Sequence, residues 1–476
     1  MKAQNKSTLA GLIIFSSTMM IISSCKKSFL DLRPYTSVSS DVAITNESDM
    51  QAALNGTYGN MNSVNLYGRS TPLFGDLVSD NLYISTINSN RYLDFFQINY
   101  TVTDANGQGI WQSSYSTILR ANNVINSSLT GNENIDQLRG EALAIRALMY
   151  FELVKFFGKP YTVDPNALGV PLILTYDPTL KPTRNSVQEV YAQIEKDLTD
   201  AATLMTRDKS SGFFTKWAAK ALLARMYQFK GEWDKAQTTA EDVINNSGYS
   251  LLQLNDVSSF WQNNTDRSDK VEVLFEIVFD ATNNIGNSSL PYFFDQTGYG
   301  DALATESLYN LYSNTDVRKD WFIVGSAIRG PDAKVVNKFP NAGAADKDEM
   351  KVIRMSEVYF IAAEAAYHNN DEAAARTYLN AVATKRDPAF TGYTSSGQAL
   401  LDDILLERRK ELAFEGHRYW DLVRNNLDVT RVDLANNYPG NVPLVLETSN
   451  FRRILPIPQG ELDANPNIRE QQNPGY

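Results

Sequence analysis

The sequence predicts a mainly α-helical protein, a scaffold of helical hairpins that carries large irregular loop insertions and a few short strands. Two observations lead to this fold class. Several segments repeat apolar residues at the i, i+3, i+4 spacing of amphipathic helices. Between them lie two long stretches, 62–109 and 251–351, which are rich in Asn, Ser, Gly, Asp and aromatic residues and show few helical stripes. With 43% hydrophobic residues, the 476-residue chain has ample material for a core.

The first 25 residues have the pattern of a bacterial secretion signal. Lys2 and Lys6 form a short positive segment, and an uncharged stretch from Leu9 to Ile22 follows. This stretch is too short for a comfortable membrane span, which needs about 20 residues. Two small residues then precede Cys25, as in a lipoprotein box whose cysteine is acylated and becomes the new N-terminus. We therefore expect a signal peptide at 1–24 and a lipid anchor at Cys25; the alternative is an incidental cysteine after an ordinary signal peptide.

The cysteine count and the net charge limit the fold and its partners. Cys25 is the only cysteine, so the chain cannot form an intramolecular disulfide. The formal net charge is −11 at pH 7, and removal of a leader with its two lysines would make the chain still more acidic. An acidic surface of this kind argues against nucleic acid or anionic lipid as a partner.

Two helices in the first half of the chain are predicted together with their ends. The segment from Leu138 to Phe157 places apolar residues on one face, and Gly158 with Pro160 ends it. Ser186 is followed three residues later by Glu189, the spacing of a capping box. This box predicts that a helix begins at 187 and runs to 205.

Two further segments are predicted to be helical hairpins. Helices at 216–229 and 233–245 flank a turn at Gly231, and helices at 356–367 and 372–384 flank a turn at 369–370. One constant shift along the sequence aligns three pairs of small apolar residues, which are Ala224 with Ala363, Ala236 with Ala375, and Val243 with Val382. This spacing resembles the tetratricopeptide hairpin, in which neighbouring units stack and bury a shared apolar seam. Because the repeats are degenerate and widely separated, a regular solenoid is not expected.

The two long insertions are the expected place for recognition. Val271 to Asp280 alternates apolar and polar residues as a strand does, and the rest of both insertions lacks regular periodicity. Loops held on a rigid scaffold commonly carry the binding residues of a protein.

The most charged segment is ERRKELAFEGHRYWDLVR, which ends at Arg424. Glu411 and Glu415 lie one helical turn apart and could suggest a glycosidase, and His417 with Asp421 could suggest a metal site. The alternative is a solvated helix face or an ion-pair ladder, for which Lys410, Arg418 and Arg424 are available. We prefer this second interpretation because the segment also recurs in the family discussed below.

Other catalytic signatures are absent from the sequence. The chain has two histidines, and it contains no HExxH, GxSxG or GxxxxGK motif. The segment DANGQG, from Asp104 to Gly109, resembles a calcium loop, but its glycine comes too early for the known spacing. We expect a turn there.

Long stretches of the chain resemble one known family, SusD/RagB. In the N-terminal half the similarity is carried by SFLDLRP after the cysteine, AALNGTYGNM, IWQSSYSTILRANNVI, LRGEALAIRALMYFELVKFFG, RNSVQEVYAQIEKDL and TKWAAKALLARMYQFKGEWDKA. In the C-terminal half it is carried by VIRMSEVYFIAAEAAY, LLERRKELAFEGHRYWDLVR and LPIPQGELDANPNIREQQNPGY. The segments occur in the family's order from the leader to the last residue. The resemblance divides the chain into a signal peptide at 1–24, a SusD-like N-terminal region at 25–250 and a SusD/RagB C-terminal region at 251–476.

The resemblance implies a function as well as a fold. It implies a tetratricopeptide-like lipoprotein of the outer membrane that captures oligosaccharides at the cell surface and delivers them to a TonB-dependent transporter of the SusC type. It implies no catalytic residue and no cofactor. Lys26-Lys27-Ser28 follows the anchor without an acidic cluster, so display on the periplasmic side is the alternative to display on the exterior.

Candidate ligand-binding residues come from both insertions. A sugar is held by flat apolar rings against its C–H face and by planar polar groups on its hydroxyls. The family places its ligand aromatics in loops of these two regions, although the loops do not align by motif. The first insertion offers Asp80, Asn81, Tyr83, Arg91, Tyr92, Phe95 and Phe96. The second offers Trp261, Tyr292, Phe293, Phe294, Tyr299, Trp321 and Phe322.

The alternative for each of these aromatic residues is a place in the core beneath the loops. The segment from Pro291 to Gly300 is the one that we favour for binding, because three consecutive aromatic residues cannot all face inward. Its glycines, Gly298 and Gly300, favour a mobile loop.

Three functions follow from this reading of the sequence. The first is a non-catalytic lipoprotein that binds glycans and hands them to a transporter. The second is a peptide-capturing lipoprotein on the same scaffold, and the third is a secreted glycosidase. Stacked aromatic rings with Asp, Asn and Arg favour sugars, whereas exposed backbone edges and a charged cavity favour peptides.

Overall fold

The computed structural model describes the chain outside residues 1–43, 264, 345–347, 433–437, 439 and 441. The predicted signal peptide and Cys25 therefore lie outside the described residues. Residues Asn46–Tyr476 form one compact unit. The division of the chain at residue 250 stays a prediction. In the described part of the chain, no helix combines the length and the apolar character needed to cross a bilayer.

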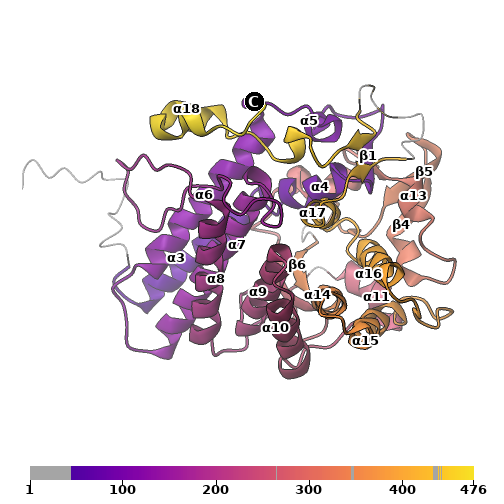
Figure 1. Cartoon of the computed structure of the whole chain (residues 1–476), viewed down its shortest axis with the longest axis horizontal. Helices are drawn as coiled ribbons and strands as arrows, with labels where there is room; N and C mark the ends of the chain where they lie inside the picture. Colours follow the sequence, from indigo (N-terminus) through magenta and orange to yellow (C-terminus); the bar gives the residue numbers. More distant parts are fainter. Residues whose placement is uncertain (1–43, 264, 345–347, 433–437, 439, 441) are drawn as a thin grey trace, which may run out of the picture. The chain divides into compact units, whose positions relative to one another are not determined.

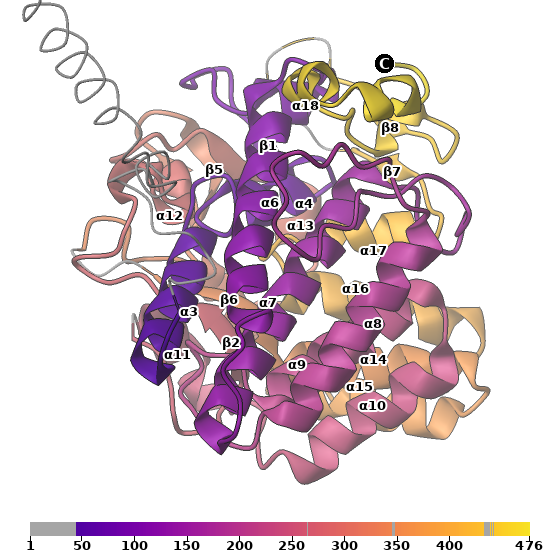
Figure 2. The same ribbon diagram turned by 90° about the vertical axis from the view of Figure 1, so that its left-hand side faces the viewer.

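A row of packed helices forms the scaffold of the unit. Consecutive helices contact one another from α6 through α7, α8, α9 and α10 to α14, and α15 and α16 pack on α14. Figure 2 shows α6, α7 and α8 side by side, and Figure 1 shows α9, α10, α14 and α15 continuing the row. Their bounds, with those of α3, are α3 Glu47–Met61, α6 Ala105–Ile125, α7 Glu133–Phe157, α8 Val187–Leu204, α9 Lys216–Lys230, α10 Trp233–Asn246, α14 Met355–His368, α15 Glu372–Ala383 and α16 Gln398–Glu411. The mainly helical, tetratricopeptide-like scaffold is confirmed.

Local capping signals fix the helix ends as predicted. Helix α7 ends at Phe157, and the backbone N–H of Gly158 donates to the carbonyl of Val154. At the start of α8, the Ser186 hydroxyl accepts from the N–H of Glu189, whose carboxylate accepts from the N–H of Ser186 at 2.7 Å. This reciprocal pair satisfies two backbone donors that a helix start would otherwise leave free.

The two predicted helical hairpins are α9 with α10 and α14 with α15. All six residues of the three aligned pairs have 0% exposure, and these are Ala224, Ala363, Ala236, Ala375, Val243 and Val382. The small side chains allow close helix packing along the seam where α10 meets α14. Gly231 turns the first hairpin with φ +73°, a conformation that glycine adopts without strain.

The insertions fold into short strands and helices that pack against the row, with α4 (Ser70–Leu77) on α6 and β2 (Val273–Ile277) on α9. A four-stranded antiparallel sheet has the order β1-β3-β5-β4, with β4 at an edge. It joins strands from both insertions, because Leu82 of β1 pairs with Ala304 of β3. The strands are β1 Leu82–Ile84, β3 Ala302–Ala304, β4 Phe322–Ser326 and β5 Gly330–Val336.

The predicted strand within 271–280 is present as β2, Val273–Ile277, which pairs with β6, Met350–Arg354. All five residues of β2 are buried, so its two faces do not differ in exposure as the alternation predicted. Both faces are covered by protein, which explains the difference. The remaining elements are α4 Ser70–Leu77, α5 Leu93–Gln97, α11 Val257–Gln262, α12 Leu290–Phe294, α13 Glu306–Tyr309, α17 Arg418–Arg424, β7 Val429–Thr430, β8 Val445–Leu446 and α18 Gln459–Ala464.

The structure corrects two local predictions. The segment from 405 to 424 is two helices, α16 and α17, because Phe414 and Gly416 have φ values of +71° and +83°. A Cβ on Gly416 would lie 2.6 Å from the backbone of Pro72, so only glycine fits at this contact with α4. The segment from Asp104 to Gly109 is the start of α6, with Asp104 at the N-cap position, and is therefore helical rather than a turn.

Candidate functional site

Two polar candidates from the first insertion are buried links between elements. The carboxylate of Asp80 accepts from Nε of Arg418 at 2.8 Å and lies 3.2 Å from Nη1 of Arg409. Burial alone would raise the pKa of Asp80, but the two guanidinium groups outweigh burial and hold the pKa below its usual value. Asn81 has 0% exposure and accepts from Nε of Arg409. Both side chains attach β1 to the segment of α16 and α17, so their hydrogen-bonding groups are already used.

The aromatic candidates of the first insertion lie in the core. Tyr83, Tyr92, Phe95 and Phe96 have exposed fractions of 5% or less. The hydroxyl of Tyr92 accepts from Nε of Arg69 at 3.0 Å, so even its polar end has a partner inside the protein.

The two tryptophan candidates form a buried cage around a lysine. Trp261 and Trp321 meet edge to face with ring centres 5.7 Å apart. The ammonium group of Lys338 lies 3.7 Å from the centre of the Trp321 ring and 4.4 Å from that of Trp261. Burial lowers the pKa of Lys338 to about 8, although the carboxylate of Glu415, which accepts its N–H, acts in the opposite direction. These rings therefore bind a cation of the protein itself.

The segment from Pro291 to Gly300 divides as the sequence predicted. Phe293 and Phe294 are buried, as is Phe322 of β4, whereas Tyr292 and Tyr299 are half-buried. The three consecutive aromatic residues therefore do not all face the core.

Three of the predicted residues come together at the surface, namely Arg91, Tyr292 and Tyr299, which we call the platform. The guanidinium carbon of Arg91 lies 3.9 Å from the centre of the Tyr299 ring. The Tyr292 and Tyr299 rings meet edge to face with centres 5.1 Å apart. The two insertions thus contribute adjacent groups, although more than 200 residues of chain separate them.

The polar ends of the platform have no partner within the described part of the protein. Neither the guanidinium of Arg91 nor the hydroxyl groups of Tyr292 and Tyr299 form a hydrogen bond or an ion pair there. The stacking on Tyr299 holds the Arg91 fork in place while its N–H groups stay available. The platform therefore presents hydrogen-bond donors and acceptors that no other described protein group uses, on rings that are only half-buried.

The backbone beneath the platform is unusual on both sides. Asn90 and Tyr92 flank Arg91 and have φ values of +62° and +56°, which residues other than glycine rarely adopt. Strained residues of this kind persist where surrounding contacts fix them, and they concentrate at functional sites. On the other loop, a Cβ on Gly298 would lie 2.8 Å from the carbonyl oxygen and 3.0 Å from two ring carbons of Tyr292. Gly298 is thus required for the close packing of Tyr292.

Sequence reasoning missed two residues that support the platform from below, Asp301 and Arg329. Arg329 donates to the carbonyl of Tyr299 at 2.7 Å, and Asp301 accepts from the N–H of Ser89 at 3.0 Å. The only signal for Arg329 is the Gly330-Pro331 pair after it, which marks the turn between β4 and β5.

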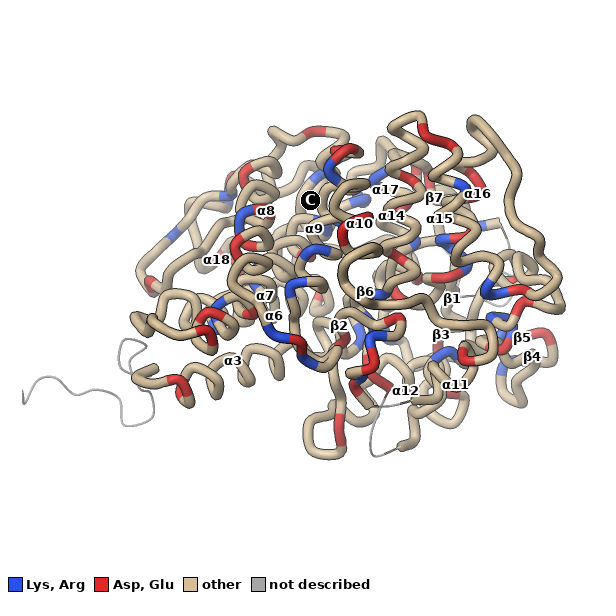
Figure 3. Tube along the Cα trace, turned by 90° about the horizontal axis from the view of Figure 1, so that it is seen from below, with Lys and Arg blue, Asp and Glu red and all other residues tan. Residues whose placement is uncertain are grey.

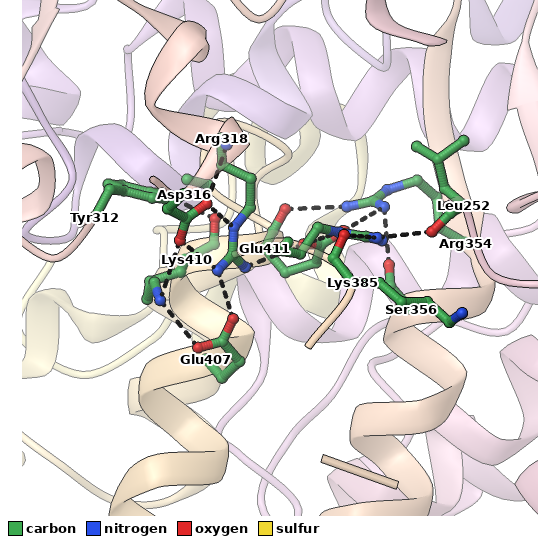
Figure 4. A network of polar contacts seen from close by, with 12 residues as sticks. Leu252, Tyr312, Asp316, Arg318, Arg354, Ser356, Lys385, Glu407, Lys410 and Glu411 are labelled. Atoms are coloured by element: carbon green, nitrogen blue, oxygen red, sulfur yellow. Dashed lines mark hydrogen bonds and ion pairs between the residues drawn. The ribbon is translucent and has the colours of Figure 1, made fainter. Parts of the chain in front are cut away.

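The charged segment around Glu411 is a buried ion-pair network. Glu411 accepts from Arg386 at 2.9 Å, from Arg354 at 3.0 Å and from Arg318 at 3.1 Å. Figure 4 shows Arg318 and Arg354 on two sides of Glu411. Burial alone would raise the pKa of Glu411, but the three guanidinium groups outweigh burial and hold the pKa well below its usual value. The interpretation as a solvated face was wrong. Ion pairs are present, but Glu411 is bound by three arginines from outside the segment and not by Lys410, Arg418 or Arg424.

The two catalytic alternatives for this segment lack the groups that they need. Glu415 accepts from Arg354 at 2.7 Å, and its pKa is also lowered, so neither carboxylate of the pair is available as a general acid. Asp421 accepts from Arg408 and Arg424, each at 2.9 Å. Over the described residues, no group of three or more His, Cys, Asp or Glu side chains is placed to hold a metal ion.

Acidic and basic residues also occur together on the other elements of the protein. Figure 3 shows acidic and basic residues interspersed on the same helices. Two open cavities lie on the scaffold and have no platform residue in their linings. One of about 500 Å³ lies between α7 and α8, and one of about 370 Å³ lies beside α3 and β2.

Comparisons with known proteins agree with this fold. Residues 28–228 match a family model described as starch-binding associating with outer membrane, and residues 329–476 match the SusD family model. A SusD-like protein of Bacteroides ovatus is 24% identical over 459 residues, which cover 87% of this chain and 82% of that protein.

Solved structures extend the comparison over almost the whole unit. A putative sugar binding protein of Bacteroides vulgatus superposes with a TM-score of 0.83 and 34% identity, covering 91% of this chain and 99% of that one. A SusD superfamily protein of Bacteroides thetaiotaomicron gives a TM-score of 0.83 and 31% identity, covering 90% of this chain and 100% of the other. These family models, sequence identities and superpositions together show that the chain belongs to the SusD superfamily.

Proposed function

We propose that this protein captures a carbohydrate on the platform and delivers it to an outer-membrane transporter of the SusC type. The observation that carries the proposal is the platform, where two half-buried tyrosine rings and an unpaired guanidinium group lie together. Two relatives support the ligand class, because the matching family model is described as starch-binding and a structural relative as a putative sugar binding protein.

The chemistry of the platform suits a sugar. The C–H face of a pyranose packs on an aromatic ring, and its hydroxyl groups need donors and acceptors nearby. Arg91 offers a planar set of N–H donors that can bridge two neighbouring hydroxyls. The hydroxyls of Tyr292 and Tyr299 can donate or accept as the sugar requires. Because only three side chains take part, we expect modest affinity, which suits a protein that must release its ligand.

Anchoring and delivery complete the proposed function. Acylated Cys25 would hold the protein at the outer membrane, because each buried methylene contributes about 0.8 kcal/mol and several chains together give stable anchoring. Display on the exterior places the platform where glycans arrive first. The family resemblance supports the transporter as a partner.

A calorimetric screen of the full chain in detergent against neutral and acidic oligosaccharides tests this function. We expect binding of at least one glycan, with loss of affinity in the double variant Tyr292→Ala, Tyr299→Ala. Binding that the double variant retains in full would place the ligand elsewhere. Binding of peptides and of no carbohydrate would overturn the proposal.

Peptide capture is the second candidate, because the edge strand β4 offers a backbone for it. β4 stands at the end of the sheet, and within the described residues no backbone group of another element pairs with its outer edge. Its residues Ile323 and Val324 are 50% and 52% exposed. An extended peptide can add to such an edge as a further strand. Unlabelled peptides in the same calorimetric screen separate the two candidates.

We also propose that the protein is not an enzyme. The paired carboxylates of the charged segment are buried and bound to arginines, which leaves them no role in hydrolysis. Incubation of each bound glycan with the protein, followed by chromatography of the products, tests this point. Release of shorter sugars would favour the glycosidase alternative.

A further inference from the structure

Among the described residues, no hydrogen bond connects Arg91 of the platform with Tyr292 or Tyr299. Arg91 belongs to the loop after β1, and Tyr292 and Tyr299 belong to the segment from α12 to β3. Ring contacts connect them, and such contacts alone would allow the two loops to separate. The orientation of the platform must therefore be fixed by other residues that hydrogen-bond to these two loops.

Asp301 connects the two loops. Its Oδ1 atom accepts from the N–H of Ser89 at 3.0 Å, and its Oδ2 atom accepts from the hydroxyl of the same residue. The backbone of Asp301 donates to the carbonyl of Phe293 at 3.0 Å and accepts from the N–H of Ser85 at 3.1 Å. With 0% exposure, this residue joins the loop of Arg91 to the loop of the tyrosines.

Arg329 connects Tyr299 and Asp301 to the turn between β4 and β5. Its Nη2 atom donates to the carbonyl of Tyr299 at 2.7 Å and lies 4.0 Å from Oδ1 of Asp301. Its Nη1 atom approaches Oε1 of Gln296 at 3.4 Å, and that oxygen also accepts from the hydroxyl of Ser326 at 2.8 Å. Although it carries a charge, Arg329 is only 8% exposed, so its guanidinium is committed to these internal contacts.

These contacts matter for binding because they reach the backbone of the platform tyrosines. The carbonyl that Arg329 holds belongs to Tyr299 itself, and the N–H of Tyr299 donates to the carbonyl of Tyr292 at 3.2 Å. One guanidinium group therefore fixes the backbone of both tyrosines. A site that is ordered before the ligand arrives avoids the entropy loss of ordering its loops on binding.

We infer that Arg329 and Asp301 are positioning residues that hold the platform in the geometry that binds the ligand. This inference rests on the proposed function. Neither residue touches the ligand, and each acts through the residues above it. Arg329 acts through Tyr299, and Asp301 acts through the loop that carries Arg91.

The test measures glycan affinity of the full chain in detergent for Arg329→Gln and Asp301→Asn. We expect about tenfold weaker binding for each, a loss typical of removing one important contact in a binding site. In a Tyr299→Ala background, Arg329→Gln should weaken binding only about twofold, because the Tyr299 ring that Arg329 positions is already gone. Affinity of Arg329→Gln equal to that of the unchanged protein would overturn the inference, as would full additivity with Tyr299→Ala.

A matched control separates positioning from general destabilisation. Arg184 is another buried arginine, 5% exposed, whose guanidinium donates to the backbone carbonyls of Gly169, Phe157 and Leu168. The variant Arg184→Gln should lower the melting temperature and leave the affinity unchanged. A loss of affinity equal to that of Arg329→Gln would show a general effect and overturn the inference.

Hydrogen exchange separates failure of the inference from failure of the proposed function. In Arg329→Gln, amide exchange across 291–301 should become at least several-fold faster, while exchange in the helical row stays unchanged. This result supports the positioning role even if the unchanged protein binds no glycan, in which case only the proposed function fails. Unchanged exchange across 291–301 would overturn the positioning role.

Discussion

Single aromatic residues of this protein serve two different purposes, and burial separates them. Trp261 and Trp321 enclose an internal lysine, whereas Tyr292 and Tyr299 keep part of their rings and both hydroxyl groups outside. Burial of a whole ring stabilises the fold, and partial burial fixes a ring while leaving surface for a partner. Residue type alone does not distinguish the two purposes.

The first prediction concerns the ring of Tyr299, which contacts both other members of the platform. Tyr299→Ala should weaken glycan binding about 10- to 100-fold, because truncation of a central aromatic residue removes about 1–3 kcal/mol of binding energy. Tyr299→Phe keeps the ring and should lose less. Calorimetric titration measures both. The control is Tyr176→Ala, which removes a tyrosine that is 60% exposed and outside the platform; an equal loss there would refute a specific role for Tyr299.

The second prediction concerns the pH dependence of stability at Glu349. This carboxyl group is 1% exposed, and neither of its oxygens has a hydrogen-bond partner among the described residues. Burial raises the pKa of Glu349 to about 8, and Lys351 opposes the shift only partly. Because the folded state favours the protonated form, the stability from this group is complete below the pKa of the unfolded chain. It is lost as the pH rises through about 8.

Glu349→Gln, which stays neutral, should therefore raise the free energy of unfolding more at pH 9 than at pH 5, by roughly 1–3 kcal/mol. Chemical denaturation of both proteins at the two pH values measures the difference. Glu470→Gln, at an exposed position, serves as the control. An identical effect of Glu349→Gln at both pH values would contradict the prediction.

At the scale of elements, the contact between α4 and the turn that joins α16 to α17 decides where the charged segment bends. Gly75 and Gly416 bring two backbones together, since a Cβ on Gly75 would lie 2.0 Å from the carbonyl oxygen of Gly416. The bend turns Glu415 toward Arg354 and Lys338. In this arrangement Arg354 donates to both Glu411 and Glu415.

The third prediction tests this bend. Gly416→Ala should lower the free energy of unfolding by more than the about 1–2 kcal/mol that a left-handed conformation costs an ordinary residue. The excess arises because the added Cβ would lie 2.6 Å from the backbone of Pro72. Gly231 has φ +73° in the left-handed region, and the atom nearest to its Cβ position lies 3.7 Å away, so Gly231→Ala is the matched control and should show the conformational cost alone. Equal losses in denaturant titrations of the two variants would exclude the close contact as a cause.

For the whole molecule, the helical row supplies the base against which the insertions pack, and the platform lies where the two insertions meet. The chain outside the described residues supplies the proposed attachment to the membrane. Under the proposed function both parts are needed, since an unattached protein would carry its ligand away from the proposed transporter.

The fourth prediction concerns this attachment. Cys25→Ser should move the protein from the membrane fraction to the soluble fraction and abolish incorporation of labelled fatty acid, because acylation needs the thiol. Ser24→Ala keeps a small residue before the cysteine and should leave both readouts unchanged. Membrane association of Cys25→Ser would argue for an ordinary signal peptide and another means of attachment.

Much of the fold could be predicted because its signals are local. The capping box of Ser186 with Glu189 and the turn at Gly231 each depend on neighbouring residues, and the structure confirms both. The aligned small residues are a repeat within the sequence, and all of them are buried. Two local interpretations were wrong. The charged segment was expected to be one helix, whereas contact with α4 accompanies a bend between α16 and α17. The segment 104–109 was expected to be a turn, whereas it begins helix α6.

The candidate site could be predicted only in part. The run of three aromatic residues correctly indicated that one of them faces outward, but nothing local assigns Tyr83 or Trp321 to the core. The support from Asp301 and Arg329 was also invisible, because it links loops that lie far apart in the sequence.

By itself the sequence determined the class of scaffold, the ends of its main helices and the predicted lipid anchor, since periodicity, capping and a signal segment act over a few neighbouring residues. Only the tertiary structure decided which rings are exposed and which arginines are free. Exposure and charge pairing depend on neighbours from distant parts of the chain. Arg91 and Arg354 are the same residue type, yet one has no hydrogen-bond or ion-pair partner among the described residues and the other binds Glu411 and Glu415 in the core.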